Sequence, residues 1–187
     1  MRIKRGLDVI ISGTAIVLLL PVFLLLAIII CLESPGPPVF AQQRIGLHGR
    51  PFVMFKFRSM VKDAPLLGAW HTAKNDPRIT RVGRFIRVTS LDELPQLWNV
   101  FIGDMSLIGP RPEVPLQESL YQPADWRLRH RVRPGVTGLA QVSGRSDISE
   151  GDRLRHDLAY AAHPTFAGDM HILLKTISVV FRKAGVN

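Results

Sequence analysis

The sequence has a single cysteine, Cys31, among 187 residues. One cysteine excludes an internal disulfide framework and a multi-cysteine zinc site. The histidines lack the paired spacing of metal ligands, no glycine-rich stretch leads into the Gly-Lys-Ser/Thr of a P-loop, and no serine lies in a nucleophile elbow. Acidic residues are also few, 15 against 24 lysines and arginines, which gives a formal net charge of +9. The chain therefore lacks the common nucleophile and metal motifs and favours anionic partners.

Charge is wholly missing from residues 9–32, an apolar stretch of 24 residues. Such a stretch, with 47% hydrophobic residues overall, argues against a disordered chain and against a fully soluble cytosolic protein. The basic start fits a signal peptide, but the apolar region exceeds the usual ~7–15 residues and Cys31-Leu32-Glu33 is no small-residue cleavage site. Bulky residues before Cys31 also disfavour a lipoprotein anchor. The sequence therefore predicts a membrane segment.

Two membrane arrangements fit this stretch. As a helix, 24 residues reach about 36 Å, enough for a hydrocarbon core of about 30 Å. Pro21 lies near the midpoint, where proline kinks a helix, and each half of about 18 Å is too short to span alone. Basic residues lie on both flanks, with Arg44 and Arg50 following, so both flanks look cytoplasmic. From the residues alone, a kinked span and a re-entrant helix-break-helix in one leaflet are equally open.

The rest of the chain predicts an α+β fold that is mostly helical and has one small β-hairpin. Prolines and glycine break the chain at 33–38. We expect a hairpin over 39–60, a loop over 61–80, helices over 81–88 and 90–101, a rigid loop over 103–116 and a glycine-rich turn region over 135–144. The alternating arginines of 124–133 fit either a strand or a helix.

Apolar residues follow helical spacing near the C-terminus and predict a helix over 169–184. Asp169 suits its N-terminal end, Arg182 and Lys183 suit the other, and Gly185 can cap it. At about 24 Å this helix is too short to span a membrane. It either packs on the core or lies in the membrane interface.

Two adjacent carboxylates, Asp92 and Glu93, form the first candidate site. Neighbouring carboxylates repel each other, and their pKa values can shift or they can recruit a divalent cation. Ser90-x-x-Glu93 is also a capping box, and Asp92 could itself cap a helix with Pro95 in its first turn. From the residues alone, capping is the simpler interpretation.

Basic residues in rigid surroundings form the second candidate site. Arg111 lies between two prolines that restrict its backbone, and a fixed guanidinium can bind phosphate through two hydrogen bonds. Lys56 and Arg58 flank Phe57 and would point to one face of a strand. A polyanion site and an ordinary solvated surface are equally open for this set. Its further members, each beside proline, glycine or turn residues, are Arg87, Arg133 and Arg145.

Six ordered motifs resemble the bacterial sugar transferases, which are monotopic phosphoglycosyl transferases of the bacterial inner membrane. The resemblance covers essentially the whole chain, and the chain looks like the minimal catalytic unit without the N-terminal membrane domain of larger members. Leu139 and Ser143 depart from the aromatic residue and the asparagine that many members have there. The matching motifs are Lys4-Arg5-x-x-Asp8 and those within residues 34–60, 75–87, 89–100, 103–112 and 129–145.

The resemblance implies transfer of a phosphosugar from a UDP-sugar to polyprenyl (undecaprenyl) phosphate, with Mg²⁺ and release of UMP, as the first membrane step of glycan assembly. Asp92 would be the nucleophile that forms an aspartyl-phosphosugar, and Glu93 would assist through Mg²⁺ or a proton. Arg87, Arg111 and Arg145 would contact phosphates, with Lys56, Arg58 and Arg133 as further candidates.

The same resemblance divides the chain into a re-entrant membrane helix, residues 1–33, broken at Pro21, and a cytoplasmic catalytic domain with interfacial helices, residues 34–187. We expect membrane lipids but no nucleic acid among its partners. The alternative from charge alone is a membrane-tethered basic module that binds nucleic acid or anionic lipid, or an adaptor for acidic proteins. Neither alternative needs Asp92 or Glu93.

Overall fold

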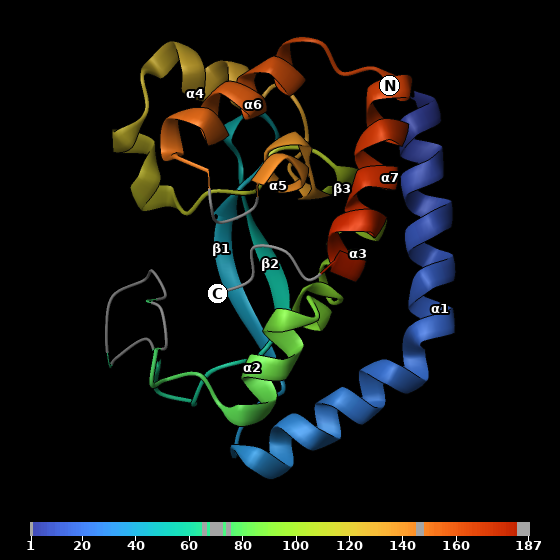
Figure 1. Cartoon of the computed structure of the whole chain (residues 1–187), viewed down its shortest axis with the longest axis vertical. Helices are drawn as coiled ribbons and strands as arrows, with labels where there is room; N and C mark the ends of the chain where they lie inside the picture. Colours follow the sequence, from blue (N-terminus) through green and yellow to red (C-terminus); the bar gives the residue numbers. More distant parts are fainter. Residues whose placement is uncertain (1, 65–66, 68–72, 74–75, 145–147, 183–187) are drawn as a thin grey trace.

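The computed structural model describes residues 2–64, 67, 73, 76–144 and 148–182. Helices α1 to α7, two small sheets and short 3₁₀ turns make up this part of the chain, which confirms the α+β class (Figure 1). Arg145, Lys183 and Gly185, named above, lie outside the described residues.

Helix α1 covers Arg2–Glu33 without interruption and contains Pro21. Its ribbon bends sharply between its two halves (Figure 1), as expected where proline removes a backbone donor and clashes with the preceding turn. Its apolar part has a mean hydropathy of 3.3 and is only 11% buried, so by length and composition it could cross a membrane. The expected helix-break-helix is one continuous, kinked helix; the re-entrant path stays a prediction.

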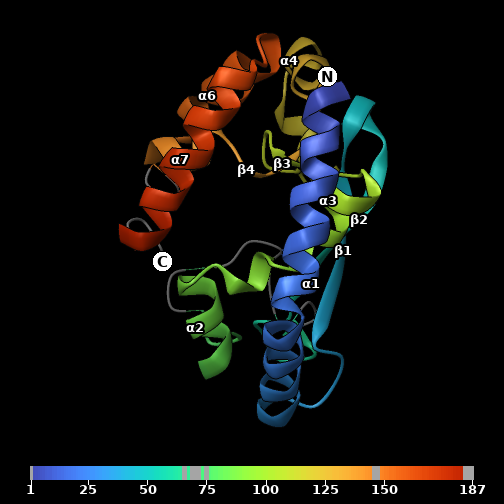
Figure 2. The same ribbon diagram turned by 90° about the vertical axis from the view of Figure 1, so that its right-hand side faces the viewer.

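The polar N-terminal end of α1 is fastened to the rest of the chain. Lys4 Nζ lies 2.6 Å from Asp169 Oδ2 at the start of α7, which Figure 2 shows beginning beside the N-terminus. Arg5 donates to the carbonyls of Val100 and Phe101 at the end of α3. Lys4 and Arg5 therefore hold the fold together as well as contributing positive charge to that flank.

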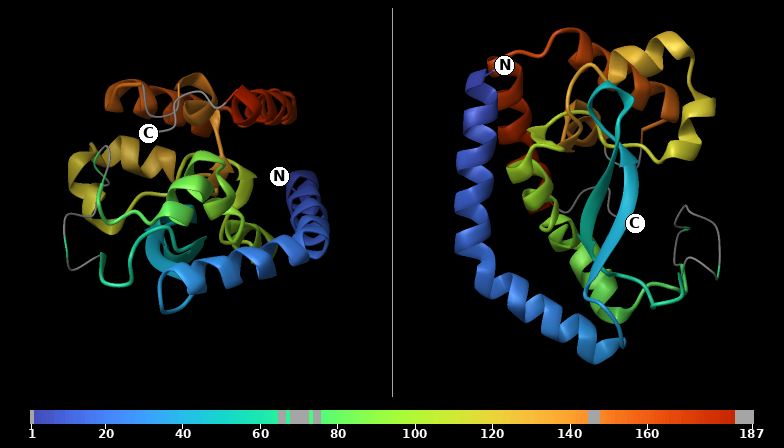
Figure 3. Two further views of the ribbon diagram at one scale, coloured as in Figure 1. Left: turned by 60° about the horizontal axis from the view of Figure 1, so that its bottom comes forward. Right: turned by 180° about the vertical axis from the view of Figure 1, so that it is seen from behind.

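The predicted hairpin is confirmed. Strands β1 (Val39–Ile45) and β2 (Pro51–Phe57) pair antiparallel, around the 3₁₀ turn η1 (Leu47–Gly49). The right-hand view of Figure 3 shows the hairpin within the angle formed by α1. The side chain of Asn99 completes the edge of β2: its Oδ1 accepts from Phe55 N at 3.0 Å and its Nδ2 donates to Val53 O at 2.7 Å.

A second sheet was not predicted. Strands β3 (Ser106–Ile108) and β4 (Gly135–Thr137) pair in parallel, within segments expected to be a loop and a turn region. The backbones approach so closely that a Cβ on Gly135 would lie 2.1 Å from Gly109 N. The glycines of these segments thus allow two distant parts of the chain to pair as strands. Helix α5 (Leu139–Gly144) begins two residues after β4.

Helix α2 (Arg81–Val88) has the predicted bounds, with Thr80 as its N-cap and the Glu33 carboxylate accepting from Arg81 N and Val82 N. The helix predicted over 90–101 is in fact the 3₁₀ turn η3 (Leu91–Glu93) followed by α3 (Gln96–Ile102). The capping-box interpretation is wrong, because Ser90 has φ 59° and its side chain makes no capping hydrogen bond.

The C-terminal half is helical. The ambiguous arginine segment, residues 124–133, is helical up to Arg129, where α4 (Pro123–Arg129) ends, and the 3₁₀ turn η4 (Pro115–Leu120) precedes this helix. Helix α6 covers Glu150–Ala162, and α7 covers Phe166–Arg182, starting three residues before the predicted helix. Ile172 of α7 is buried in a cluster with residues of β3 and α6, while Met170, Leu174 and Ile177 are exposed. The helix therefore packs on the core along one side and presents an apolar row on another.

Apolar packing fixes the turn η3 in place. Leu91 and Leu94 pack against a buried cluster in which Leu26 and Ile30 of α1 meet Phe57 of β2 and Ile86 of α2. The two residues between these leucines, Asp92 and Glu93, therefore have their backbone anchored on both sides.

Candidate active site

Asp92 and Glu93 form the centre of the candidate site, in the turn between α2 and α3. The left-handed backbone of Ser90 lets the chain leave α2 and start a new turn, and the flanking leucines anchor that turn to the core. The carboxylates are thus fixed by the backbone and by packing and have no capping role.

Glu93 holds two cations. Its Oε1 lies 2.8 Å from Lys56 Nζ of β2 and 2.8 Å from Arg111 Nη2. Burial alone would raise the pKa of Glu93, but the nearby charges of Arg111 and Lys56 outweigh burial and hold that pKa far below its usual range. Glu93 is therefore an ionised anchor that sets the positions of both cations.

Asp92 is different from its neighbour. Its side chain makes no hydrogen bond or ion pair with any residue that the structure describes, although the residue is only 9% exposed. Burial raises the pKa of Asp92, and the charge of Glu93 adds to this, while Lys56, Arg111 and Arg87 oppose it. A desolvated carboxylate without a partner beside several cations is suited to nucleophilic attack on a phosphorus atom.

The structure brings three of the predicted cations to the carboxylates. Lys56 and Arg111 bind Glu93, and Arg87, at the end of α2, is close enough to lower the pKa of Asp92. The Arg111 side chain is 43% exposed, so it can reach a ligand while touching Glu93. Burial lowers the pKa of Lys56, only partly offset by Glu93. The site is thus a compact set of positive groups around one free carboxylate, suited to a diphosphate.

Two predicted cations lie elsewhere. Arg58 follows β2, which ends at Phe57, so strand alternation does not place it beside Lys56. Its buried guanidinium donates to the carbonyls of Ser34, Pro35 and Gly36 after α1. Arg133 Nε donates to Gly103 O at 2.8 Å. Within the described part of the chain, no hydrogen bond or ion pair joins Arg58 or Arg133 to the two carboxylates.

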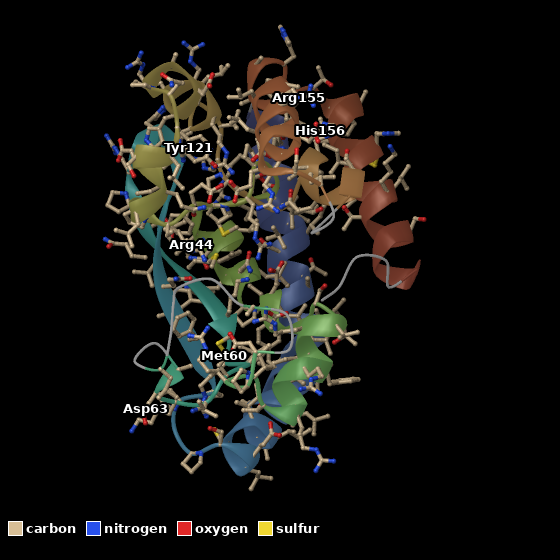
Figure 4. The ribbon with its side chains drawn as sticks, turned by 60° about the vertical axis from the view of Figure 1, so that its left-hand side comes forward. Arg44, Met60, Asp63, Tyr121, Arg155 and His156 are labelled. Carbon is tan, nitrogen blue, oxygen red and sulfur yellow. The ribbon has the colours of Figure 1, made fainter. Side chains whose placement is uncertain are left out.

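Two arginines near the site were missed as candidates. Arg44 of β1, labelled in Figure 4, has its pKa lowered to about 10 by burial and by the charge of Arg111. Arg129 is 2% exposed and donates to Arg111 O at 2.6 Å. The sequence held a signal for Arg44: its cross-strand partner Phe52 lies four residues from Lys56, so strand alternation puts Arg44 and Lys56 on one face. For Arg129 no local pattern gives this role.

The carboxylates fit a Mg²⁺ ion only together with substrate oxygens. Within the described ranges, no group of three or more histidine, cysteine, aspartate or glutamate side chains could hold a metal. Mg²⁺ is commonly held by one or two carboxylates plus phosphates and water. Asp92 and the second oxygen of Glu93, Oε2, have no hydrogen-bond partner within that part of the chain and suit this role.

An apolar pocket of about 290 Å³ lies close by, between α1, the hairpin and α3. Phe55 lines it from the face of β2 opposite Lys56, and Pro95 lines it two residues after Glu93. Helix α1 lines the pocket with Ile16, before Pro21, and Phe23, after it, and Val39 and Trp98 complete the lining. The pocket therefore lies on the side of β2 opposite to Lys56, and Pro95 is its lining residue nearest in sequence to Glu93.

A family model and several curated relatives that match this chain are all sugar or sugar-phosphate transferases. The family model described as bacterial sugar transferase matches residues 1–183. A UDP-galactose-lipid carrier transferase of Erwinia amylovora and an undecaprenyl-phosphate galactose phosphotransferase of Salmonella typhimurium are each 42% identical and are matched over 98% of this chain, which spans 41% of their length. A UDP-glucose:undecaprenyl-phosphate glucose-1-phosphate transferase of Caulobacter vibrioides is also 42% identical, over 93% of this chain and 68% of its own length.

Proposed function

Since this chain belongs to the bacterial sugar transferase family, we propose that it transfers a phosphosugar from a UDP-sugar to undecaprenyl phosphate and releases UMP. The names of the relatives support the donor and acceptor classes. The observation that carries the proposal is the pair of neighbouring carboxylates in which Glu93 binds two cations and Asp92 binds none.

In the first step, a carboxylate oxygen of Asp92 attacks the sugar-linked phosphorus. A new oxygen–phosphorus bond forms, the bond from that phosphorus to the bridging oxygen breaks, and its electron pair leaves with UMP. The product on the protein is an aspartyl-phosphosugar. Because an anion attacks a diphosphate, Lys56, Arg87 and Arg111 must offset the repulsion, and little else is asked of the protein.

In the second step, a phosphate oxygen of undecaprenyl phosphate attacks the same phosphorus. The bond to Asp92 breaks, the carboxylate is regenerated, and the lipid carries a diphosphate-linked sugar. Two steps suit two substrates of opposite solubility, because UMP leaves before the lipid reacts. Glu93, ionised and bound to Lys56 and Arg111, keeps both cations in place through both steps.

A bound Mg²⁺ would supply further charge neutralisation at the diphosphate, held by Asp92 and Glu93 together with substrate oxygens. Arg145 is a further donor contact proposed from the family motif alone.

The membrane placement is part of the proposal. The kinked apolar α1 would enter and leave one leaflet of the inner membrane, which keeps the site on the cytoplasmic face at the level of lipid headgroups. The exposed apolar row of α7 would lie at the interface, and the product would begin a surface glycan such as an exopolysaccharide, an O-antigen or a glycoprotein.

The test is UMP release from a panel of UDP-sugars with Mg²⁺ and undecaprenyl phosphate, using folded, detergent-solubilised protein. We expect one or a few sugars to give UMP in equal amount to lipid-linked product. No UMP with any donor would contradict the proposal. Steeply salt-dependent binding of nucleic acid that does not need Asp92 would favour the basic-module alternative.

A further inference from the structure

The segment that carries Arg111 is held in an unusual way. It contains two prolines, Pro110 and Pro112, which have no N–H to donate. The backbone hydrogen bonds that hold this segment are therefore made mainly by its carbonyl groups, as acceptors. Every one of four consecutive carbonyls accepts a hydrogen bond. The donors are Gly135 N to Pro110 O at 2.9 Å, Arg129 Nη2 to Arg111 O at 2.6 Å, Arg44 Nη1 to Pro112 O at 3.0 Å and Ile45 N to Glu113 O at 2.9 Å.

Two of these four donors are arginine side chains that reach in from other elements. Arg44 comes from β1, where Gln42 Oε1 accepts from its Nε and Nη2 and fixes the plane of its guanidinium. Neither of its partners is charged, so its positive charge is not neutralised by an ion pair within the described part of the chain.

Arg129 comes from α4 and is held by two acids. Its Nη2 lies 2.7 Å from Asp157 Oδ2 of α6 and 3.1 Å from Glu113 Oε1, and Glu113 also accepts from Tyr121 Oη, labelled in Figure 4. Burying so many charges is costly unless they are paired and well oriented. The network connects α4 and α6, which bear no predicted site residue, to the carbonyl of Arg111.

From this arrangement we infer that Arg44 and Arg129 are positioning residues that act through Arg111, holding its backbone so that its guanidinium reaches both Glu93 and the diphosphate of the donor. The inference rests on the proposed function and adds two residues to it. A displacement of about 1 Å in a phosphate contact is enough to lower the rate by a large factor, so hydrogen bonds that fix the backbone of Arg111 would affect catalysis.

A double-mutant cycle tests the inference, because residues that act through one another have non-additive effects. Arg44→Met, Arg111→Ala and the double variant are compared by kcat/KM for the UDP-sugar and by the affinity for UDP in calorimetry. We expect Arg44→Met to lower both quantities about tenfold when Arg111 is present and less than about twofold when Arg111 is alanine. Arg44→Lys, which keeps one donor for Pro112 O, should recover part of the loss.

Arg5 gives a matched control, because like Arg44 it is an arginine whose side chain binds the backbone of a distant element, here the carbonyls of Val100 and Phe101, and it makes no hydrogen bond to the segment that carries Arg111. Any effect of Arg5→Met should be equal in both backgrounds. Equal losses from Arg44→Met in both backgrounds would overturn the inference. If Arg44→Met does not fold, the same cycle is measured with Arg44→Lys or Arg129→Lys, and a loss that is larger with Arg111 present than with Arg111→Ala again supports the inference. Binding of UDP without UMP release by the wild-type protein would contradict the proposed function and still leave the coupling measurable.

Discussion

The turn η3 and the segment of residues 109–113 face each other across the site and are stabilised in opposite ways. In the segment, four consecutive carbonyls are bound, two of them by arginine side chains. In the turn, Asp92 is buried, yet its carboxylate has no hydrogen-bond partner among the described residues. In the proposed mechanism, the segment that binds the donor is fixed by four hydrogen bonds, while the carboxylate that reacts has no hydrogen-bond partner among the described residues. This difference fits the general finding that functional groups cost stability.

Asp92→Asn should give the largest effect. We expect turnover to fall more than about 10³-fold, because the amide cannot attack phosphorus. The folded protein should become more stable by about 1 kcal/mol at neutral pH, since a buried carboxylate with a raised pKa disfavours folding wherever it is ionised. Thermal unfolding followed by circular dichroism checks the second point; a clearly lower melting temperature would show that Asp92 is a structural residue.

The pH dependence distinguishes the two carboxylates. Asp92 must be ionised to react and its pKa is raised, so kcat/KM should rise with pH through a value above that of an ordinary aspartate, ~3.9. Lys56 lowers the pKa of Asp92, so Lys56→Met should move this acid limb to higher pH. Glu93 raises it, so Glu93→Gln should move the limb to lower pH. The measurement is the pH profile of UMP release for the three proteins, and shifts in the same direction would contradict the electrostatic account.

Arg58 should give the smallest effect on catalysis. Its guanidinium binds the carbonyls after α1, so Arg58→Met should lower the free energy of unfolding by about 2 kcal/mol while KM for the UDP-sugar changes less than about twofold. Chemical denaturation and steady-state kinetics check the two points. A large rise in KM with unchanged stability would restore Arg58 to the donor site.

Local patterns predicted much of this fold. The hairpin follows from strand-like residues around a glycine turn, α2 from the apolar spacing of residues 81–88, and the bend of α1 from one proline. The parallel pairing of β3 with β4 gives no local signal, because each strand has three residues and the partners are far apart in sequence. The separation of residues 90–101 into η3 and α3 also gave no local signal, because it depends on the left-handed backbone of Ser90.

The site residues were predicted by type, while their roles depend on tertiary contacts. Asp92 and Glu93 are neighbours of the same charge, and only the positions of Lys56 and Arg111 make one an anchor and leave the other free. Arg58 was expected beside Lys56 because strand alternation was extended one residue beyond the end of β2. Arg129 is separated from Arg111 by a turn and a helix, so its hydrogen bond to the Arg111 carbonyl could not be read from spacing.

The central claim is that the free carboxylate of Asp92 becomes covalently linked to the phosphosugar. The most direct measurement is intact-protein and peptide mass spectrometry after mixing the protein with Mg²⁺ and its UDP-sugar without any lipid acceptor. The account predicts a mass increase of one phosphosugar on the peptide that contains Asp92, one UMP released for each modified protein, and loss of the adduct when undecaprenyl phosphate is added. Turnover with lipid but no adduct without it, or an adduct on another residue, would contradict the account.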